Sequence, residues 1–254
     1  MDSSEKSAIG IIPARYASTR FPGKPLVEIK GVSMIERVYR QASLCTKLSG
    51  VIVATDDSRI FDHVKSFGGR VMLTSASHQS GTERINEVVT KLENNGEWYD
   101  IAINIQGDEP FIQPSQIEKV IEIFNNPSVE IGTLVKLIEN SEDIFNPNIV
   151  KVVPDGHGKA LYFSRSPIPF VRNTISDNWL HDNRIYKHIG IYGYATDILK
   201  ELAELAPAPP EKAESLEQLR WLYYGYSIYT GVTDIETIGI DTPEDLSKLI
   251  NIPC

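Results

Sequence analysis

Short apolar runs alternate with amphipathic stretches through the first half of the chain. The apolar runs are five or six residues long, as is typical of strands buried in a parallel sheet. Between them, apolar residues recur at helical spacing. This alternation predicts a three-layer α/β fold with a mostly parallel sheet and helices on both faces. Strands are predicted at residues 8–12, 51–55, 70–74 and 100–105, and helices at 33–47, 57–67, 81–94 and 114–126.

The second half of the chain has a less regular pattern. Residues 149–165 predict a hairpin that turns at Asp155 and Gly156. We interpret residues 1–254 as a single domain, in which residues 149–190 form a smaller, hairpin-containing insertion. The other predicted elements are strands at 129–138, 188–194 and 235–240, and helices near 195–205, near 214–224 and from Thr242 onward.

A basic loop follows the first predicted strand. The stretch IIPARYASTRFPGKP (residues 11–25) contains Arg15, Arg20 and Lys24 but no acid, in a chain whose formal net charge is −9. Ligands of open parallel sheets bind at the carboxyl ends of the strands, where this loop is expected. Its cations and small residues suit a phosphate ligand, although a solvated basic loop is the alternative. The spacing matches neither a Walker A motif nor Gly-x-Gly-x-x-Gly.

Two aspartates are expected at the same edge of the sheet. Asp108 follows the strand at 100–105 in NIQGDEPFI, and Asp241 ends the strand at 235–240 in GIDTPED. Mg²⁺ prefers oxygen ligands and retains water, so two carboxylates together with substrate phosphates are enough to hold it. The alternatives are an ordinary Asp-Glu-Pro turn and a helix cap. The sequence contains no His/Cys cluster typical of zinc and no Gly-x-Ser-x-Gly hydrolase motif.

Composition narrows the class of partner. A net charge of −9 argues against a nucleic-acid binder or a protein of anionic membrane surfaces, because both need a broad basic field. No apolar run approaches the roughly 20 residues of a membrane span, and no signal peptide is recognisable, so we expect a cytoplasmic protein. Cys45 and Cys254 form neither a disulfide framework nor a metal-binding pair.

Eight blocks of sequence resemble one family. They are IIPARYASTRFPGKPL, HQSGTERI, NIQGDEPFI, FNPNIVKVV, ALYFSRSPIPF, HIGIYGY, ESLEQLRWLYYG and GIDTPEDL. The first block alone indicates only the wider sugar nucleotidyltransferase group. Together, from about residue 8 to 250, they closely resemble the 3-deoxy-manno-octulosonate (Kdo) cytidylyltransferases. The resemblance implies a Rossmann-like fold, a homodimer, and an enzyme that couples CTP to Kdo. Its products would be pyrophosphate and CMP-Kdo, which Gram-negative bacteria use for lipopolysaccharide.

The resemblance also assigns roles to individual residues. Asp108 and Asp241 would bind Mg²⁺, and with Arg15 and Lys24 they form the expected catalytic set. Residues 149–190 would serve sugar binding and dimerisation. The expected CTP-binding residues are Pro13, Ala14, Arg15, Ser18, Arg20, Lys24, Ser80, Gly81 and Gln106. The expected sugar-binding residues are Gln106, Arg165, His188, Tyr192, Glu217 and Gln218.

The chemistry of these residues agrees with a sugar-acid ligand. Arg165 can bind a carboxylate with two parallel hydrogen bonds, and the other side chains offer donors and acceptors to hydroxyls. Taken singly, each has an ordinary structural alternative. His188 and Tyr192 can belong to the core, Arg165 to an ion pair, and Glu217 with Gln218 to a solvated helix face.

Three rival functions remain open at the level of sequence. A related enzyme that activates sialic acid or 8-amino Kdo would share the basic loop and both aspartates. A non-catalytic, nucleotide-binding regulatory protein is disfavoured because Lys24, Asp108 and Asp241 are all present. A purely structural α/β module leaves the basic loop unexplained. For an enzyme, we expect an in-line displacement at the α-phosphorus of CTP, in which positioning and charge neutralisation do most of the catalysis.

Overall fold

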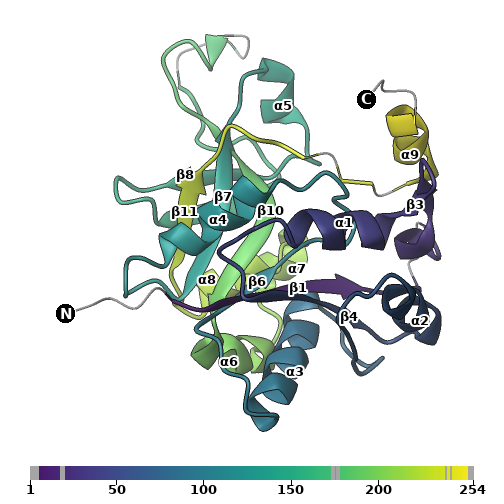
Figure 1. The fold of residues 1–254 in the computed structure, drawn as a ribbon. Helices are drawn as coiled ribbons and strands as arrows, with labels where there is room; N and C mark the ends of the chain where they lie inside the picture. The colour runs from purple at the N-terminus through teal and green to yellow at the C-terminus, as the bar shows by residue number, and fades with distance from the viewer. Residues whose placement is uncertain are drawn as a thin grey trace.

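The computed structural model describes residues 6–17, 21–172, 175, 178–237, 239–240 and 242–250. Within them, nine strands form one sheet, which Figure 1 shows as the centre of the molecule. Seven of the strands follow the order β11-β7-β10-β6-β1-β4-β5, while β8 pairs with β10 and β9 pairs with β8. The strands are β1 (Ala8–Ala14), β4 (Gly50–Thr55), β5 (Val71–Leu73), β6 (Ile101–Asn104), β7 (Ile131–Leu137), β8 (Lys151–Pro154), β9 (Ala160–Ser164), β10 (Tyr186–Ala195) and β11 (Ile228–Val232).

The strand directions confirm the predicted mostly parallel sheet. β5, β4, β1 and β6 run parallel to one another, and β11 runs parallel to β7. β10 is antiparallel to both of its neighbours, β6 and β7. The predicted hairpin is also confirmed, because β8 and β9 pair in antiparallel register. Its turn is closed by the N–H of Asp155, which donates to the carbonyl of Lys159 at 2.8 Å.

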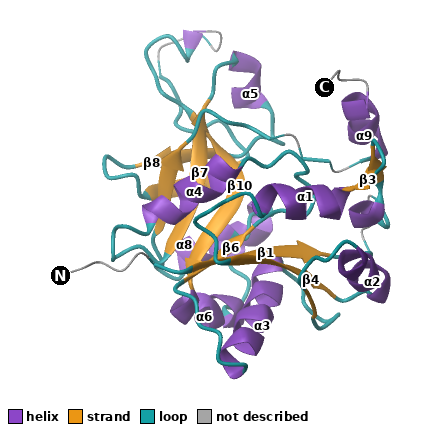
Figure 2. Cartoon of the chain, in the orientation of Figure 1, coloured by secondary structure: helices purple, strands orange, loops and turns teal. Residues whose placement is uncertain are grey.

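Helices cover both faces of the sheet and complete the three layers (Figure 2). Apolar side chains of α1, α2 and α4 pack on one face, and those of α3, α6 and α8 pack on the other. A small hairpin of β2 (Glu28–Ile29) and β3 (Val32–Ser33) precedes α1. The helices are α1 (Met34–Ala42), α2 (Ser58–Ser66), α3 (Gly81–Asn94), α4 (Pro114–Ile123), α5 (Ser141–Phe145), α6 (Leu199–Glu204), α7 (Pro209–Glu214), α8 (Gln218–Tyr223) and α9 (Pro243–Ile250).

The predicted last strand is wrong. The structure has no ladder pairing at the described residues 235–237 and 239–240, and the strand lies earlier, at β11. Ile228–Val232 pairs in parallel with β7, and Ile228 is completely buried. The short sequence IYTGV has no pattern that predicts such a strand. The later segment serves another purpose, because the N–H of Ile240 donates to the carbonyl of Asp108 at 2.9 Å.

β10 passes unusually close to α4 at Gly193. A Cβ atom built on this glycine would lie 2.7 Å from Cε2 of Phe124 and 2.8 Å from Cγ1 of Val120. Real Cβ atoms do not approach carbon atoms so closely, so any larger residue would force the strand and the helix apart. The absence of a side chain at Gly193 therefore allows α4 to pack directly on the antiparallel strand.

We expect Gly193→Ala to lower the free energy of unfolding by about 1–3 kcal/mol, as overpacking of a close-packed core does. Urea denaturation would measure the change. Gly156→Ala is the matched control, because a Cβ there meets nothing within 4 Å. Its effect should stay within about 0.5 kcal/mol. Equal destabilisation by both substitutions would contradict the packing argument.

Candidate active site

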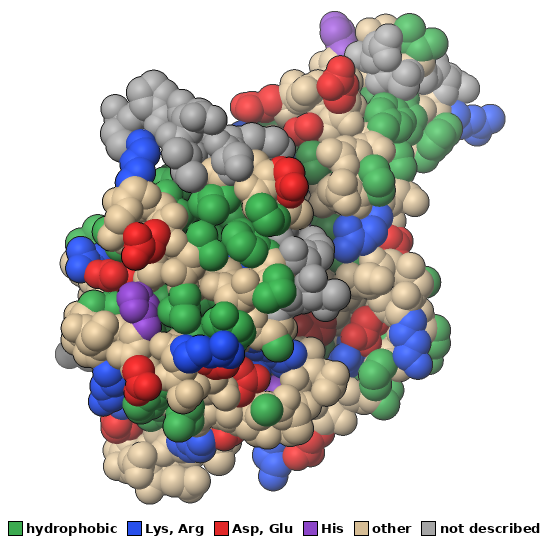
Figure 3. Space-filling view, turned by 90° about the vertical axis from the view of Figure 1, so that its right-hand side faces the viewer, with side chains coloured by type: hydrophobic (Ala, Val, Ile, Leu, Met, Phe, Trp, Pro, Cys, Tyr) green, Lys and Arg blue, Asp and Glu red, His purple; other side chains and the backbone are tan. Residues whose placement is uncertain are grey.

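The carboxyl ends of the central parallel strands lie at one edge of the sheet. β1 pairs with β6 so that Ile11 is opposite Asn104, and the loops that follow the two strands therefore start side by side. Figure 3 looks onto this edge, where acidic and basic side chains gather around a recess. The candidate residues found here are Pro13 and Ala14 at the end of β1, Gln106 and Asp108 after β6, and Ser80 and Gly81 at the start of α3.

Two glycines lie where these loops converge on Pro13, and the packing requires glycine at only one of them, Gly107. A Cβ on Gly107 would lie only 2.8 Å from the carbonyl oxygen of Pro13, so the loop after β6 requires glycine there. A Cβ on Gly81 would lie 3.5 Å from Nδ2 of Asn104 and 3.8 Å from Cγ of Pro13. The end of β1, the end of β6 and the first turn of α3 thus form one continuous surface.

The basic loop meets the first acidic residue directly. The N–H of Gly23 donates to the carbonyl of Tyr16 at 2.9 Å, which closes the loop and leads into a short 3₁₀ helix, η1 (Lys24–Leu26). At its start, Nζ of Lys24 lies 2.8 Å from Oδ2 of Asp108. Lys24 and Asp108, which are 84 positions apart, therefore form one charged centre. The predictions for Ser18 and Arg20 lie outside the described residues.

Arg15 directly follows β1 in the same region. Its guanidinium donates to the carbonyl of His78, just before α3. Burial is the main reason why the pKa of Arg15 is lowered, and the charge of Arg84 adds to the effect. Arg15 is thus anchored between the end of β1 and the loop that leads to Ser80.

Sequence reasoning missed a further cation beside this loop. Arg59, from the first turn of α2, lies with its guanidinium carbon 3.3 Å from the centroid of the Tyr16 ring. Its N–H edge is fixed by Asp57, because Nε donates to Oδ1 at 3.0 Å and Nη2 donates to Oδ2 at 2.6 Å. The available signal was the charged turn TDDSR, which follows the second predicted strand at the same edge of the sheet.

The start of α3 carries two of the predicted CTP-binding residues, Ser80 and Gly81. Oγ of Ser80 accepts the N–H of Glu83 at 3.2 Å and so caps the helix. Glu217 lies opposite, where burial raises its pKa and the hydroxyls of Ser80 and Thr82 oppose the shift. Ser80 and Glu217, together with Gly81, line a cavity of about 500 Å³. Glu217 is therefore beside the predicted CTP residues, and Gln218, which follows it, is buried.

A second cavity brings the other sugar candidates together. Its volume is about 570 Å³, and it opens beside Asp108. Nε2 of Gln106 donates to the carbonyl of Gly190 at 2.9 Å, which fixes this side chain at the boundary between the acidic loop and β10. The residues that line the cavity include four of the predicted sugar ligands, namely Gln106, Arg165, His188 and Tyr192.

Arg165 is held in this cavity by carbonyl groups. Nε donates to the carbonyl of Glu214 at 2.7 Å, and Nη1 donates to the carbonyl of Pro147 at 3.0 Å. Its backbone N–H donates to the carboxylate of Glu214 at 2.8 Å. Contacts of this kind orient the guanidinium without ending its ability to bind an anion.

His188 and Tyr192 provide neutral polar groups. Nε2 of His188 lies 2.9 Å from Oγ1 of Thr133, and burial lowers the pKa of His188 to about 3. The imidazole is therefore uncharged at neutral pH. Burial also raises the pKa of Tyr192, a shift that nearby Thr133 opposes, and its buried hydroxyl makes no hydrogen bond of ordinary geometry among the described residues. A buried polar atom without a partner is costly, which favours a ligand that supplies one.

Two charged side chains of the cavity were missed in the sequence. Glu109 accepts the hydroxyl of Thr237 at 2.6 Å, and burial, reinforced by the charge of Asp108, raises its pKa to about 7. Lys187 lies buried between Glu236 at 2.7 Å and Asp143 at 3.3 Å. Glu109 directly follows Asp108, which was a usable signal, whereas Lys187 in a strand looks like an ordinary alternating polar position.

The structure describes only one of the two predicted metal ligands. Asp108 lines the larger cavity, whereas Asp241 lies outside the described residues. Over the described part of the chain, no three His, Cys, Asp or Glu side chains form a ready-made metal site. A carboxylate at the mouth of the cavity nevertheless fits Mg²⁺, because this ion takes few protein ligands and fills the remaining positions with water and phosphate oxygens.

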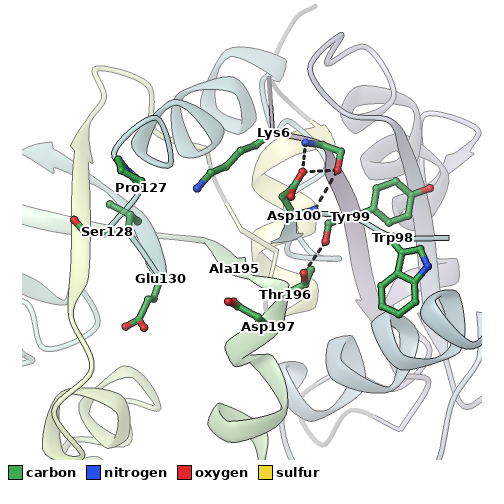
Figure 4. A pocket seen from close by; sticks show the side chains of 12 residues that line it. Lys6, Trp98, Tyr99, Asp100, Pro127, Ser128, Glu130, Ala195, Thr196 and Asp197 are labelled. Atoms are coloured by element: carbon green, nitrogen blue, oxygen red, sulfur yellow. Dashed lines mark hydrogen bonds between the residues drawn. The ribbon is translucent and has the colours of Figure 1, made fainter. Parts of the chain in front are cut away.

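A further cavity, of about 560 Å³, lies near the amino end of β6 (Figure 4). Lys6, Trp98 and Glu130 are among its lining residues, and Asp100 is held there by Ser7, whose N–H and hydroxyl both lie 2.7 Å from Oδ2. None of the described candidate residues lines this cavity. The candidate site is therefore the carboxyl edge of the sheet.

Within the described chain, no helix has the length and apolar character needed to span a membrane.

The comparisons with known proteins agree with this geometry. The family described as cytidylyltransferase matches residues 9–235. A 3-deoxy-manno-octulosonate cytidylyltransferase of Parabacteroides distasonis is 52% identical over 246 residues, which cover 95% of this chain and 96% of the relative. The enzyme of the same name from Cytophaga hutchinsonii is also 52% identical, with 97% and 98% of the two chains covered.

Solved structures extend the likeness to three dimensions. A CMP:2-keto-3-deoxy-manno-octonic acid synthetase complexed with CTP superposes with a TM-score of 0.88 and 42% identity, covering 96% of this chain and 97% of that chain. The 4-diphosphocytidyl-2C-methyl-D-erythritol synthase of Anaerococcus prevotii, with a TM-score of 0.62 and 14% identity over 97% of this chain and 98% of that chain, shares the fold alone. The matched length, the identity and the common fold together place this chain in the 3-deoxy-manno-octulosonate cytidylyltransferase family.

Proposed function

We propose that the protein transfers the cytidylyl group of CTP to Kdo and releases pyrophosphate. One observation carries the proposal: the charged centre of Lys24 and Asp108 opens into the cavity that contains Arg165. A cation-lined loop suits a triphosphate, and an arginine with neutral hydrogen-bonding groups suits a polyhydroxylated acid. A site with both features side by side suits a reaction that joins the two ligands.

The nucleotide would occupy the surface formed by β1, the basic loop and α3. Lys24 and Arg15 would neutralise the triphosphate, and the compact backbone around Pro13, Ser80 and Gly81 would accept the cytosine ring. Lys24 already faces a carboxylate in the structure, so its ammonium is held at the position where charge is needed. Such preorganisation avoids reorientation during the reaction and is a large part of electrostatic catalysis.

The sugar would occupy the cavity beside Asp108. Arg165 would bind its carboxylate, and His188, Tyr192 and Gln106 would bind its hydroxyls. The anomeric oxygen then forms a bond to the α-phosphorus as the bond from that phosphorus to the bridging oxygen breaks. Pyrophosphate leaves with the electron pair, and the proton of the hydroxyl passes to solvent or to a nearby carboxylate. The enzyme contributes mainly position and charge neutralisation.

Mg²⁺ is part of this proposal. Asp108 and Asp241 would hold the ion, which when bound would neutralise phosphate charge and lower the pKa of a coordinated hydroxyl. The carboxylate of Asp108 at the cavity mouth supports the assignment.

The proposal also includes a homodimer, a cytoplasmic location and a product used in lipopolysaccharide assembly. The dimer is supported by large apolar side chains that stand exposed within residues 149–190. Leu161, Phe170 and Ile175 are 60%, 76% and 69% exposed, respectively. A dimer contact over this segment would bury these three side chains, as interaction surfaces bury contiguous apolar patches. Sedimentation of the purified protein would test whether two copies associate.

Release of pyrophosphate from CTP and Mg²⁺ tests the function directly. Parallel reactions would contain Kdo, 8-amino Kdo, sialic acid or no sugar. We expect pyrophosphate release only in the reaction that contains Kdo. Release only with another sugar acid would keep the nucleotide site but contradict the assignment of the sugar. If none of the sugars gave release, while CTP still bound, the regulatory alternative would replace the enzyme.

Asp108→Asn should reduce kcat/KM by a factor of at least about 100, equivalent to about 3 kcal/mol of transition-state stabilisation. The amide keeps the shape of the carboxylate but removes its charge. Asp62→Asn, the same change on the exposed face of α2, is the control and should leave the kinetics unaltered. Near-normal turnover of the Asp108 variant, measured at saturating Mg²⁺, would argue against the metal assignment.

Arg165→Ala should raise KM for Kdo by a factor of about 10 to 100, the size of a lost charge-assisted hydrogen bond, and leave KM for CTP nearly unchanged. Initial rates at varied Kdo and fixed CTP would separate the two constants. Arg40→Ala removes an arginine that is 64% exposed on α1 and serves as the control. An equal rise in both KM values would show that Arg165 does not act on the sugar alone.

Glu109 should make the stability of the protein depend on pH. Its folded pKa of about 7 is above its usual value of 4.5, so the folded state holds this proton more tightly than the unfolded chain does. Its contribution to stability is full below pH 4.5 and falls as the pH rises toward 7, by up to about 1.4 kcal/mol per pH unit. Glu109→Gln should remove this fall, as urea denaturation at pH 5 and pH 8 would measure. A stability difference between the two proteins that does not change with pH would contradict the assignment.

A further inference from the structure

Lys151 is a fully buried lysine whose ammonium group binds only main-chain atoms in its described hydrogen bonds. It is the first residue of β8, and 0% of it is exposed. Nζ donates to the carbonyls of Asn146 at 2.9 Å, Ile149 at 2.5 Å and Arg165 at 2.6 Å. An ammonium group has three N–H donors, so these three carbonyls use all of them.

A charge in this place is costly to keep. Burial lowers the pKa of Lys151, the carboxylate of Glu214 opposes the shift, and the nearby charge of Arg165 adds to it. An apolar side chain of similar length would fill the same space without desolvating a charge. What it could not do is hold three carbonyl oxygens together, because their dipoles repel one another without a central donor. The role of Lys151 must therefore be sought in those three segments.

All three carbonyls belong to the wall of the sugar cavity or to the turn that leads into it. Arg165, Ile149 and Asn148 line the cavity, and Asn146 ends α5 just before them. Lys151 itself is not among the lining residues. It pairs with Ser164 of β9 on one side and Lys187 of β10 on the other, so it stands directly behind the wall.

The loop that Lys151 holds also holds the guanidinium of Arg165. Nη1 of Arg165 donates to the carbonyl of Pro147, which lies between the two loop residues bound by Lys151. Lys151 therefore fixes two supports of this arginine, namely its own carbonyl and the loop that accepts the hydrogen bond of Nη1, while the carbonyl of Glu214 separately holds Nε. Loss of the ammonium would release both supports at once.

We propose that Lys151 is a positioning residue for sugar binding, which acts by fixing Arg165 and residues 146–149. The inference rests on the proposed function, since it takes Arg165 as the group that meets the carboxylate of the sugar. It concerns the affinity for the sugar acid and leaves the nucleotide surface, built on β1 and α3, unaffected.

The test is a double-mutant cycle in the full-length enzyme, with Kdo and CTP as the varied substrates. Lys151→Met keeps the length of the side chain and removes its donors. We expect it to raise KM for Kdo about tenfold or more, and to change KM for CTP by less than about twofold. In a protein that already carries Arg165→Ala, Lys151→Met should add less than about a threefold effect, because the residue through which it acts is gone.

Two further variants keep the test decisive. Lys136→Met removes another lysine whose side chain is 13% exposed, on β7, the strand next to β10, and should leave KM for Kdo unchanged. Lys151→Gln retains an N–H₂ donor and should give a smaller rise than Lys151→Met. If Lys151→Met fails to fold, as judged by circular dichroism and CTP binding, the cycle is run with Lys151→Gln.

The outcomes separate the inference from its premise. An unchanged KM for Kdo in the Lys151 variants, with Arg165→Ala impaired, would overturn the inference alone. The inference would also be overturned if the double variant raised KM for Kdo by the product of the two single-variant factors. Lys151 would then act independently of Arg165. An enzyme inactive with Kdo, or an Arg165→Ala variant with an unaltered KM for Kdo, would overturn the premise and the inference with it.

Discussion

The ion pair of Lys24 and Asp108 connects the two halves of the site. The 2.8 Å contact joins the loop after β1 to the loop after β6, and it exists because those strands are parallel neighbours in the sheet. Close approach of Gly107 to Pro13 brings the loops within reach. In a chain with net charge −9, this arrangement keeps a cation beside a carboxylate at the place where a triphosphate and a metal ion would meet. The two charges stabilise each other until the ligands replace them as partners.

The proposed sugar cavity, beside Asp108 and Arg165, depends on a different kind of support. Its wall is built on antiparallel strands, β8 to β10, and on irregular loops rather than on the regular parallel sheet. Loops carry functional groups well only when something fixes them. Here buried ammonium groups do so: Lys151 binds three carbonyls behind the wall, and Lys187 joins Asp143 to Glu236 at its edge.

Much of the fold was predictable because its central strands are short and apolar, with helices of clear period between them. The ends of β1 and β6 were predictable for the same reason, and they located Arg15, Lys24 and Asp108. Prediction failed at the last strand, where the edge strand β11 is weakly apolar and residues 235–240 look more strand-like. It also missed Arg59, Glu109, Lys151 and Lys187, whose roles arise from contacts between segments distant in the sequence. No local pattern distinguishes such a lysine from an ordinary polar residue in a strand. The predictions for Ser18, Arg20 and Asp241 lie outside the described residues.

The central claim is that one site holds both substrates so that the sugar attacks the α-phosphorus directly. The configuration at that phosphorus tests it, with a single diastereomer of CTP that carries sulfur on the α-phosphate, together with Kdo. A single in-line displacement inverts the phosphorus centre, so we expect a nucleotide sugar of inverted configuration. Retention would require two successive displacements through an intermediate bound to the enzyme, and it would contradict the account.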